Sequence, residues 1–233
     1  MLHQEPPRRI RPTLSRLSAA PGVIVMMLGL GYWLPAAVAA ATAPAVELAR
    51  DGRAVFPVIV AAGVSDQVKA TADELAEYLG RISGAKFEVE VGDGSRGIVV
   101  GLPGGFDKLP WTVQFGGGPF QREEYVLRSH PQGLCLLGAS DLAVSHAVWD
   151  LLYRLGYRQF FPGPTWEVIP SLSRPSIAVD DRQSPSFHAR RIWYNWGLWG
   201  YNDVPYRQWC QRNRAVKGFE LNSGHAYDGI VAA

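Results

Sequence analysis

Hydrophobic and polar residues follow two different periods along residues 46–170, and this pattern predicts two helices among several strands. In residues 65–84 and 140–156, apolar positions recur at spacings of three and four, which is the spacing of one helix face. Ser65 and Ser140 stand where a helix N-cap is expected, and each stretch ends at a glycine, which suits a helix C-terminus.

The strands are predicted from short apolar or alternating stretches bounded by turn residues. They comprise residues 55–62, 86–91, 97–102, 123–129 and 133–139. The last two are expected to form a hairpin. Together with the helices they predict an α+β domain over residues 46–170, built as a mixed sheet with two helices on one face.

The pattern changes after residues 171–186, a polar segment with two prolines that we interpret as a linker. Residues 188–196 have the pattern of a strand, and a helix is expected to begin at Asp203. A second strand is expected at residues 218–221. This strand–helix–strand order predicts a separate βαβ unit within residues 187–233.

Residues 1–43 have the order of an export signal. A basic beginning that contains Arg8 and Arg9 precedes an apolar run over residues 22–40, and small residues follow. The apolar run is nearly long enough to span a bilayer, so an uncleaved membrane anchor is the alternative. We expect a secreted or periplasmic protein that meets the membrane only through this signal.

Composition and charge exclude several classes of function. A formal net charge of +2 gives no basic surface for nucleic acid. No cysteine or histidine spacing resembles a metal site, and no motif predicts a cofactor. The two cysteines, Cys135 and Cys210, are expected to be free, buried thiols.

Adjacent acidic residues do not supply a catalytic pair. Glu123-Glu124 and Asp180-Asp181 are neighbours in the sequence, and adjacent side chains on a strand point to opposite faces. We therefore expect both pairs to be solvated. His146 is expected to be structural.

Residues 139–170 resemble the end of the non-catalytic N-terminal domain of α-glucuronidases and β-N-acetylhexosaminidases. The resemblance rests on the helix Ala147–Leu155, the turn Phe161-Pro162-Gly163 and the strand Val168-Ile169-Pro170. Residues 185–190, PSFHAR, are similar to the entry of the (β/α)₈ catalytic barrel in these families. The resemblance implies that residues 187–233 are the first strand–helix–strand of an incomplete barrel.

The same resemblance implies a carbohydrate as partner. Loops that follow barrel strands form the active-site rim, and aromatic faces with polar side chains suit sugar rings. In family 20 hexosaminidases the arginine at the barrel entry binds sugar hydroxyls, which implies this role for Arg190; Arg191, which stands where that family usually has glycine, is the alternative. The expected substrate-binding residues are Arg190, Asn195, Trp196, Trp199, Asn222 and His225.

These observations predict the N-terminal portion of an exported carbohydrate-active protein of the glycoside hydrolase class. In the resembled families the catalytic carboxylates come from later barrel strands, so this chain alone is expected to be inactive. Two alternatives are a non-enzymatic carbohydrate-binding module and a structural accessory domain. DNA downstream of Ala233 is expected to encode the remaining barrel units.

Overall fold

The computed structural model describes residues 43–118, 121–192 and 200–216, which belong to one compact unit. Almost all of the predicted export signal, residues 1–42, lies outside these residues. Within the described ranges, no helix is both long and apolar enough to cross a membrane.

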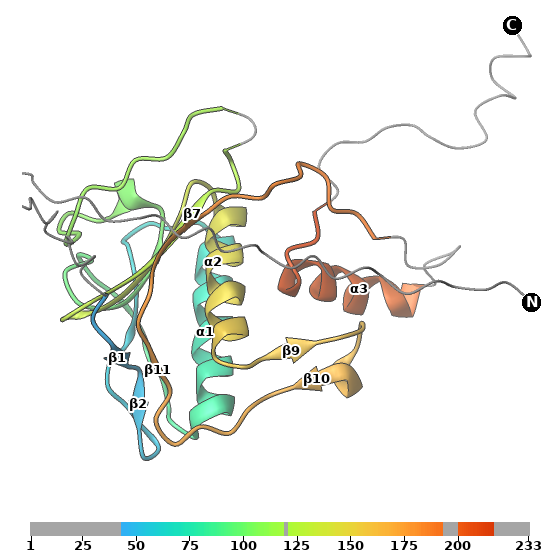
Figure 1. Cartoon of the computed structure of the whole chain (residues 1–233), viewed down its shortest axis with the longest axis horizontal. Coiled ribbons are helices and arrows are strands. Elements are labelled where there is room, and N and C mark those ends of the chain that lie inside the picture. The colour runs from blue at the N-terminus through green and yellow to red at the C-terminus, as the bar shows by residue number, and fades with distance from the viewer. Residues whose placement is uncertain (1–42, 119–120, 193–199, 217–233) are drawn as a thin grey trace, which may run out of the picture. The chain divides into compact units, whose positions relative to one another are not determined.

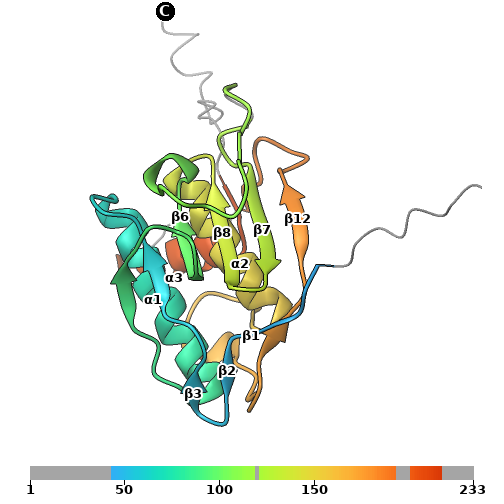
Figure 2. The same cartoon turned by 90° about the vertical axis from the view of Figure 1, so that its left-hand side faces the viewer.

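A mixed six-stranded sheet forms the centre of the unit, with the strand order β12-β7-β8-β6-β4-β5 (Figure 2). Strands β5, β4, β6 and β8 run parallel to one another, whereas β7 pairs antiparallel with both β8 and β12. The strands are β4 (Val58–Val60), β5 (Val89–Val91), β6 (Gly97–Gly101), β7 (Tyr125–His130), β8 (Gly133–Gly138) and β12 (Asp180–Gln183). The predicted α+β class with a mixed sheet is confirmed.

Two helices, α1 (Asp66–Ser83) and α2 (Asp141–Arg154), lie on the same face of this sheet (Figure 1). Ser65 caps α1 by accepting a hydrogen bond from the backbone N–H of Val68, at 3.2 Å. Ser140 caps α2 in the same way. Both predicted N-caps and the two-helix face are therefore confirmed.

The main core lies between the two helices and the sheet. It consists largely of fully buried Leu, Ile and Val side chains with Trp149 and Tyr78. The opposite face of the sheet is covered by the segment 102–115, which packs Phe106 and neighbouring apolar residues onto Val99 and Leu137. Each fully buried aliphatic side chain contributes about 1.5–3 kcal/mol to stability.

Residues 171–186, interpreted from the sequence as a linker, contain two strands. One is β12, whose four polar residues form an edge of the main sheet. The other is β11 (Ser176–Ile177), which pairs with β1 (Val46–Glu47). Strand β12 is held by backbone hydrogen bonds to β7, and an edge strand can have a charged sequence. The hydrophobic pattern therefore gives no signal for β12.

Shorter elements complete the described unit. Two small antiparallel pairs are formed by β2 (Ala49–Arg50) with β3 (Arg53–Ala54), and by β9 (Arg158–Gln159) with β10 (Glu167–Val168). Two 3₁₀ turns, η1 (Pro103–Gly105) and η2 (Pro164–Trp166), lie in the connections.

The helix α3 (Gly200–Arg212) follows and contacts α2 (Figure 1). It begins three residues before Asp203, so the prediction of Asp203 as the helix N-cap is wrong. Asp203 instead pairs with Arg207 one turn along the helix. Residues 187–192, part of which belong to the predicted first barrel strand, do not form a strand. The rest of that strand and the second strand lie outside the described residues, so the barrel remains a prediction.

Candidate functional site

Three arginines from residues 187–216 contact three carboxylates on the α+β layers. The carboxylate side chains are nearly inaccessible, with exposed fractions of 1% for Glu123, 7% for Asp150 and 6% for Glu167. The pairs are Arg190 with Glu123, Arg214 with Asp150, and Arg212 with Glu167. We call residues 187–192 and 200–216 the C-terminal segment.

Arg190 connects both ends of the C-terminal segment to the α+β layers. Its guanidinium donates to the carboxylate of Glu123, to the carbonyl oxygen of Phe187 at 2.6 Å and to that of Arg214 at 2.9 Å. Its backbone N–H also donates to the carbonyl of Val216, at 2.7 Å. Arg190 thus holds residues 187 and 214–216 together over Glu123.

The prediction that Glu123 is solvated is wrong. Glu123 lies just before β7 and faces His146 on α2, whereas its neighbour Glu124 faces Gly116 and pairs with Arg182 on β12. This is the alternation expected of adjacent residues in extended chain. Glu123 therefore lies in the interior. A buried carboxylate needs a cation beside it, and Arg190 supplies that charge.

His146, on α2, lies against the Arg190–Glu123 pair. Its Nδ1 is 3.6 Å from a carboxylate oxygen of Glu123. Burial, and then the charges of Arg190 and Arg214, lower the pKa of His146 to about 3, so the ring is neutral near pH 7. Neither Nε2 of His146 nor Oε1 of Glu123 has a hydrogen-bond partner among the described residues.

Arg214 makes the second contact. Its Nη1 lies 3.1 Å from Asp150 and donates to the hydroxyl of Tyr125 at 2.9 Å. Asp150 is shared with Arg154, at 3.2 Å, and Arg154 also reaches Asp181 at 2.6 Å. Burial, followed by the charge of Asp150, raises the pKa of Tyr125, so its hydroxyl stays protonated.

The third contact is a buried polar cluster around Glu167. Its carboxylate accepts hydrogen bonds from the hydroxyls of Tyr78, at 2.6 Å, and Tyr157, at 3.0 Å, and from Arg212. The guanidinium of Arg212 also lies 5.0 Å from the ring centre of Trp149, within the range of a cation–π interaction. Burial would raise the pKa of Glu167, but the tyrosine hydrogen bonds and the arginine charges together lower it.

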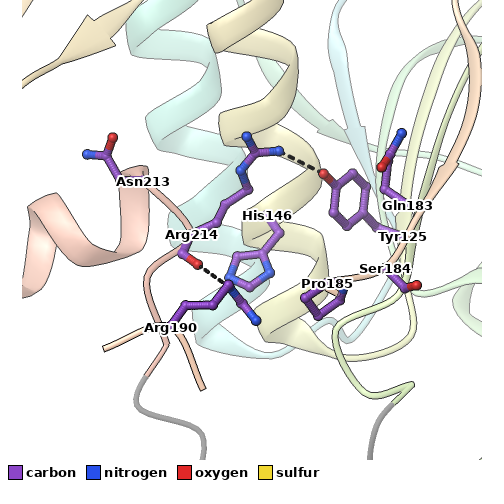
Figure 3. A pocket seen from close by; sticks show the side chains of 8 residues that line it. All are labelled: Tyr125, His146, Gln183, Ser184, Pro185, Arg190, Asn213 and Arg214. Carbon is purple, nitrogen blue, oxygen red and sulfur yellow. Dashed lines mark hydrogen bonds between the residues drawn. The ribbon is translucent and has the colours of Figure 1, made fainter. Parts of the chain in front are cut away.

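A pocket of about 280 Å³ opens between the C-terminal segment, α2 and β7. Figure 3 shows Arg214 reaching the Tyr125 hydroxyl and the His146 ring beside the Arg190 side chain. The pocket is lined by Tyr125, His146, Gln183, Ser184, Pro185, Arg190, Asn213 and Arg214.

Of the substrate-binding residues predicted from the sequence, the structure describes Arg190. Asn195, Trp196, Trp199, Asn222 and His225 lie outside the described residues. Arg190 borders the pocket, and its guanidinium donates hydrogen bonds to Glu123, Phe187 and Arg214 of the protein itself. A sugar-binding role for these residues therefore stays a prediction.

Sequence reasoning missed Glu123, His146 and Arg214 as members of one site. Arg190 and Glu123 are 67 residues apart, so no local pattern pairs them. The one local signal is the acidic doublet Glu123-Glu124, because adjacent residues of an extended chain face opposite sides and one of the two can be buried. Among the described residues, no group of three or more His, Cys, Asp or Glu side chains could hold a metal ion. Cys135 and Cys210 are both free, and Cys135 is buried whereas Cys210 is partly exposed.

No family model and no curated protein matches the chain. Among solved structures, it is similar to the GH20 β-N-acetylhexosaminidase of Streptomyces coelicolor A3(2), at 22% identity and a TM-score of 0.33, over 59% of this chain and 25% of that one. The N-acetyl-β-hexosaminidase of Streptomyces plicatus is similar at 20% identity and a TM-score of 0.36, over 62% of this chain and 25% of that one. The GH20 exo-β-N-acetylglucosaminidase of Vibrio harveyi is similar at 14% identity and a TM-score of 0.36, over 64% of this chain and 19% of that one.

The chain thus spans about a quarter of the length of the first of these structures. Identities of 14–22% and TM-scores of 0.33–0.36 give no family assignment for this chain.

Proposed function

We propose that the α+β unit is a non-catalytic accessory domain of a carbohydrate-active protein of the glycoside hydrolase class. Its role in this proposal is to hold the C-terminal segment in a fixed position. The observation that carries the proposal is the set of three buried carboxylates, each of which contacts an arginine of that segment.

Electrostatics supports a holding role. A buried carboxylate without a cation costs several kcal/mol (about 3–5 when one partner of a buried pair is removed). If the C-terminal segment left the surface, Glu123 would lose Arg190 and Glu167 would lose Arg212. Docking of the segment therefore stabilises both parts.

The state of the buried carboxylates supports a non-catalytic assignment. Glycoside hydrolysis generally needs a carboxylic acid with a raised pKa beside a second carboxylate. Glu167, in contrast, has a lowered pKa and four hydrogen-bonding or charged neighbours, Tyr78, Tyr157, Arg81 and Arg212. Glu123 is covered by Arg190 and His146. Such carboxylates hold structure and are poorly placed to protonate a leaving group.

The carbohydrate assignment is supported by the sequence resemblance at residues 139–170. Export to the periplasm or the exterior, from the signal predicted in residues 1–43, is part of the same proposal.

Two measurements test this proposal. The full chain is assayed with aryl N-acetyl-β-hexosaminide and aryl α-glucuronide substrates, and no turnover above the uncatalysed rate is expected. Turnover that disappears in Glu123→Gln or Glu167→Gln would contradict a non-catalytic role. The genomic DNA beyond Ala233 is expected to encode further strand–helix units with inward carboxylates, and a downstream sequence without them would contradict the glycoside hydrolase assignment.

A further inference from the structure

We propose that the pocket between the C-terminal segment, α2 and β7 binds one neutral, polyhydroxylated ligand of the size of a single sugar ring. The proposal goes beyond the holding role, and it rests on the docked position of the segment, which forms one wall of the pocket (Figure 3). A volume of about 280 Å³ lies just below the roughly 300–1,000 Å³ typical of small-molecule sites.

One buried acceptor on a residue that lines the pocket lacks a donor. His146 lines the pocket and is 2% exposed, and its Nε2 has no hydrogen-bond partner among the described residues. The Glu123 carboxylate lies 3.6 Å from Nδ1 and favours the tautomer with the proton on Nδ1, which leaves Nε2 as an acceptor. Oε1 of Glu123 also lacks a partner among the described residues, but Glu123 lies behind His146 and does not line the pocket. A buried acceptor such as Nε2 of His146 is normally satisfied, so the site calls for a hydroxyl donor.

Other lining groups complement a hydroxylated ring. A guanidinium carries five N–H groups, and Arg190 makes three side-chain hydrogen bonds, so donors remain on the residue that borders the pocket. Ser184 and Gln183 add polar side chains at the rim, whereas Tyr125 and Pro185 supply apolar surface for C–H groups.

The charge balance selects a neutral ligand over an anionic one. Each arginine near the pocket is matched by a carboxylate, in the pairs Arg190–Glu123, Arg214–Asp150 and Arg154–Asp181. His146 is neutral near pH 7. The carboxylate of a uronate would lose its hydration on entering the pocket. No unpaired arginine of the lining would offset that cost, so a uronate should bind more weakly than a neutral sugar.

Calorimetric titration of the full chain with N-acetylglucosamine, glucose and glucuronate tests the inference. We expect saturable one-to-one binding of a neutral sugar, and at least tenfold weaker binding of glucuronate. His146→Phe keeps a ring of similar shape and removes the acceptor, so it is expected to weaken binding at least tenfold.

The matched control is His130→Phe, because His130 is also a buried histidine but lies on β7 beside Cys135 and Trp111 and does not line the pocket. This variant should bind within twofold of the wild type. Ser184→Phe fills the pocket from an exposed position, and it keeps the test decisive if His146→Phe does not fold.

Protease protection of residues 187–216 is measured on the same samples. If the segment is protected and no neutral sugar binds, the ligand proposal is overturned while the holding role stands. Equal or tighter binding of glucuronate, or unchanged binding in both pocket variants, also overturns it. If the segment of the wild type is cleaved rapidly, both proposals fail, because one wall of the pocket is missing.

Discussion

The layers around the six-stranded sheet and the C-terminal segment are held by different forces. The layers bury a continuous set of fully inaccessible apolar side chains from both helices and the central strands. In α3, by contrast, residues 202–212 are all partly or fully exposed. The segment is attached by polar contacts, namely arginines that contact buried carboxylates and hydrogen bonds donated by Trp209, Gln211 and Asn213.

This difference teaches how the two regions should respond to perturbation. Apolar burial is nondirectional and insensitive to pH. An ion pair depends on the protonation of both partners, and removal of one partner leaves the other buried and uncompensated. The sheet should therefore set the global stability, whereas charge and pH should control the position of the C-terminal segment.

The largest effect is expected in the central sheet. Leu136→Ala, on β8, removes a fully buried side chain and should lower the free energy of unfolding by about 2–5 kcal/mol because it leaves a cavity. Val91→Ala is the control, since Val91 lies on the edge strand β5 and is 70% exposed; it should change stability by less than about 0.5 kcal/mol. Urea denaturation measures both, and similar losses in the two variants would refute the core described here.

A smaller, local effect is expected from Glu123→Gln. Loss of the charge opposite Arg190 should weaken docking of the C-terminal segment by about 1–3 kcal/mol, less than for a fully buried pair, because Arg190 is 23% exposed and water can solvate its unpaired charge. Hydrogen exchange of the α3 amides should accelerate, while exchange in β6 and β8 stays unchanged. Glu124→Gln is the matched control, because Glu124 pairs with Arg182 on β12 and not with the segment. Equal acceleration in both variants would show that Arg190 does not anchor the segment.

Acid should also release the segment. The pKa of Glu167 is lower in the folded protein than its ordinary value of 4.5, so its contribution to docking is present above pH 4.5. That contribution is lost as the pH falls from 4.5 toward the folded pKa. The near-ultraviolet circular dichroism of the tryptophans should therefore change in this range before the far-ultraviolet signal does. In Glu167→Gln this early change should shrink, and an identical pH profile in the variant would assign it to other carboxylates.

The smallest effect concerns the two thiols. Burial raises the pKa of both thiols, that of Cys135 to about 12, but Cys135 is buried whereas Cys210 on α3 is partly exposed. We expect iodoacetamide to modify Cys210 before Cys135. Glu123→Gln should speed the reaction of Cys210 alone. Faster labelling of Cys135 would mean that the sheet opens more readily than the segment.

The sequence predicts the first of these regions far better than the second. Helices α1 and α2 follow from apolar spacing and from the caps Ser65 and Ser140, since these signals are local. The central strands are apolar runs with turn residues at their ends. Strand β12 was missed because its sequence, DDRQ, is entirely polar and its partner β7 lies some 50 residues away.

The candidate site could be predicted even less. Its contacts join residues that are far apart, such as Arg190 with Glu123 and Arg212 with Glu167, and charged residues do not indicate their partners through periodicity. Arg190 was singled out through a family resemblance, which implied a sugar ligand and gave no hint of a carboxylate partner. The role of Glu123 depends on which residue of an acidic doublet turns inward, and three-dimensional packing decides this.

A double-mutant cycle between Glu123 and Arg190 tests the holding role most directly. The free energy of local opening of α3 is measured by hydrogen exchange in the wild type, in Glu123→Gln, in Arg190→Gln and in the double variant. We predict a coupling energy of about 1–3 kcal/mol, because each single change leaves the other group without its partner. Additive effects, with a coupling energy near zero, would contradict the claim that this buried pair fixes the C-terminal segment to the α+β layers.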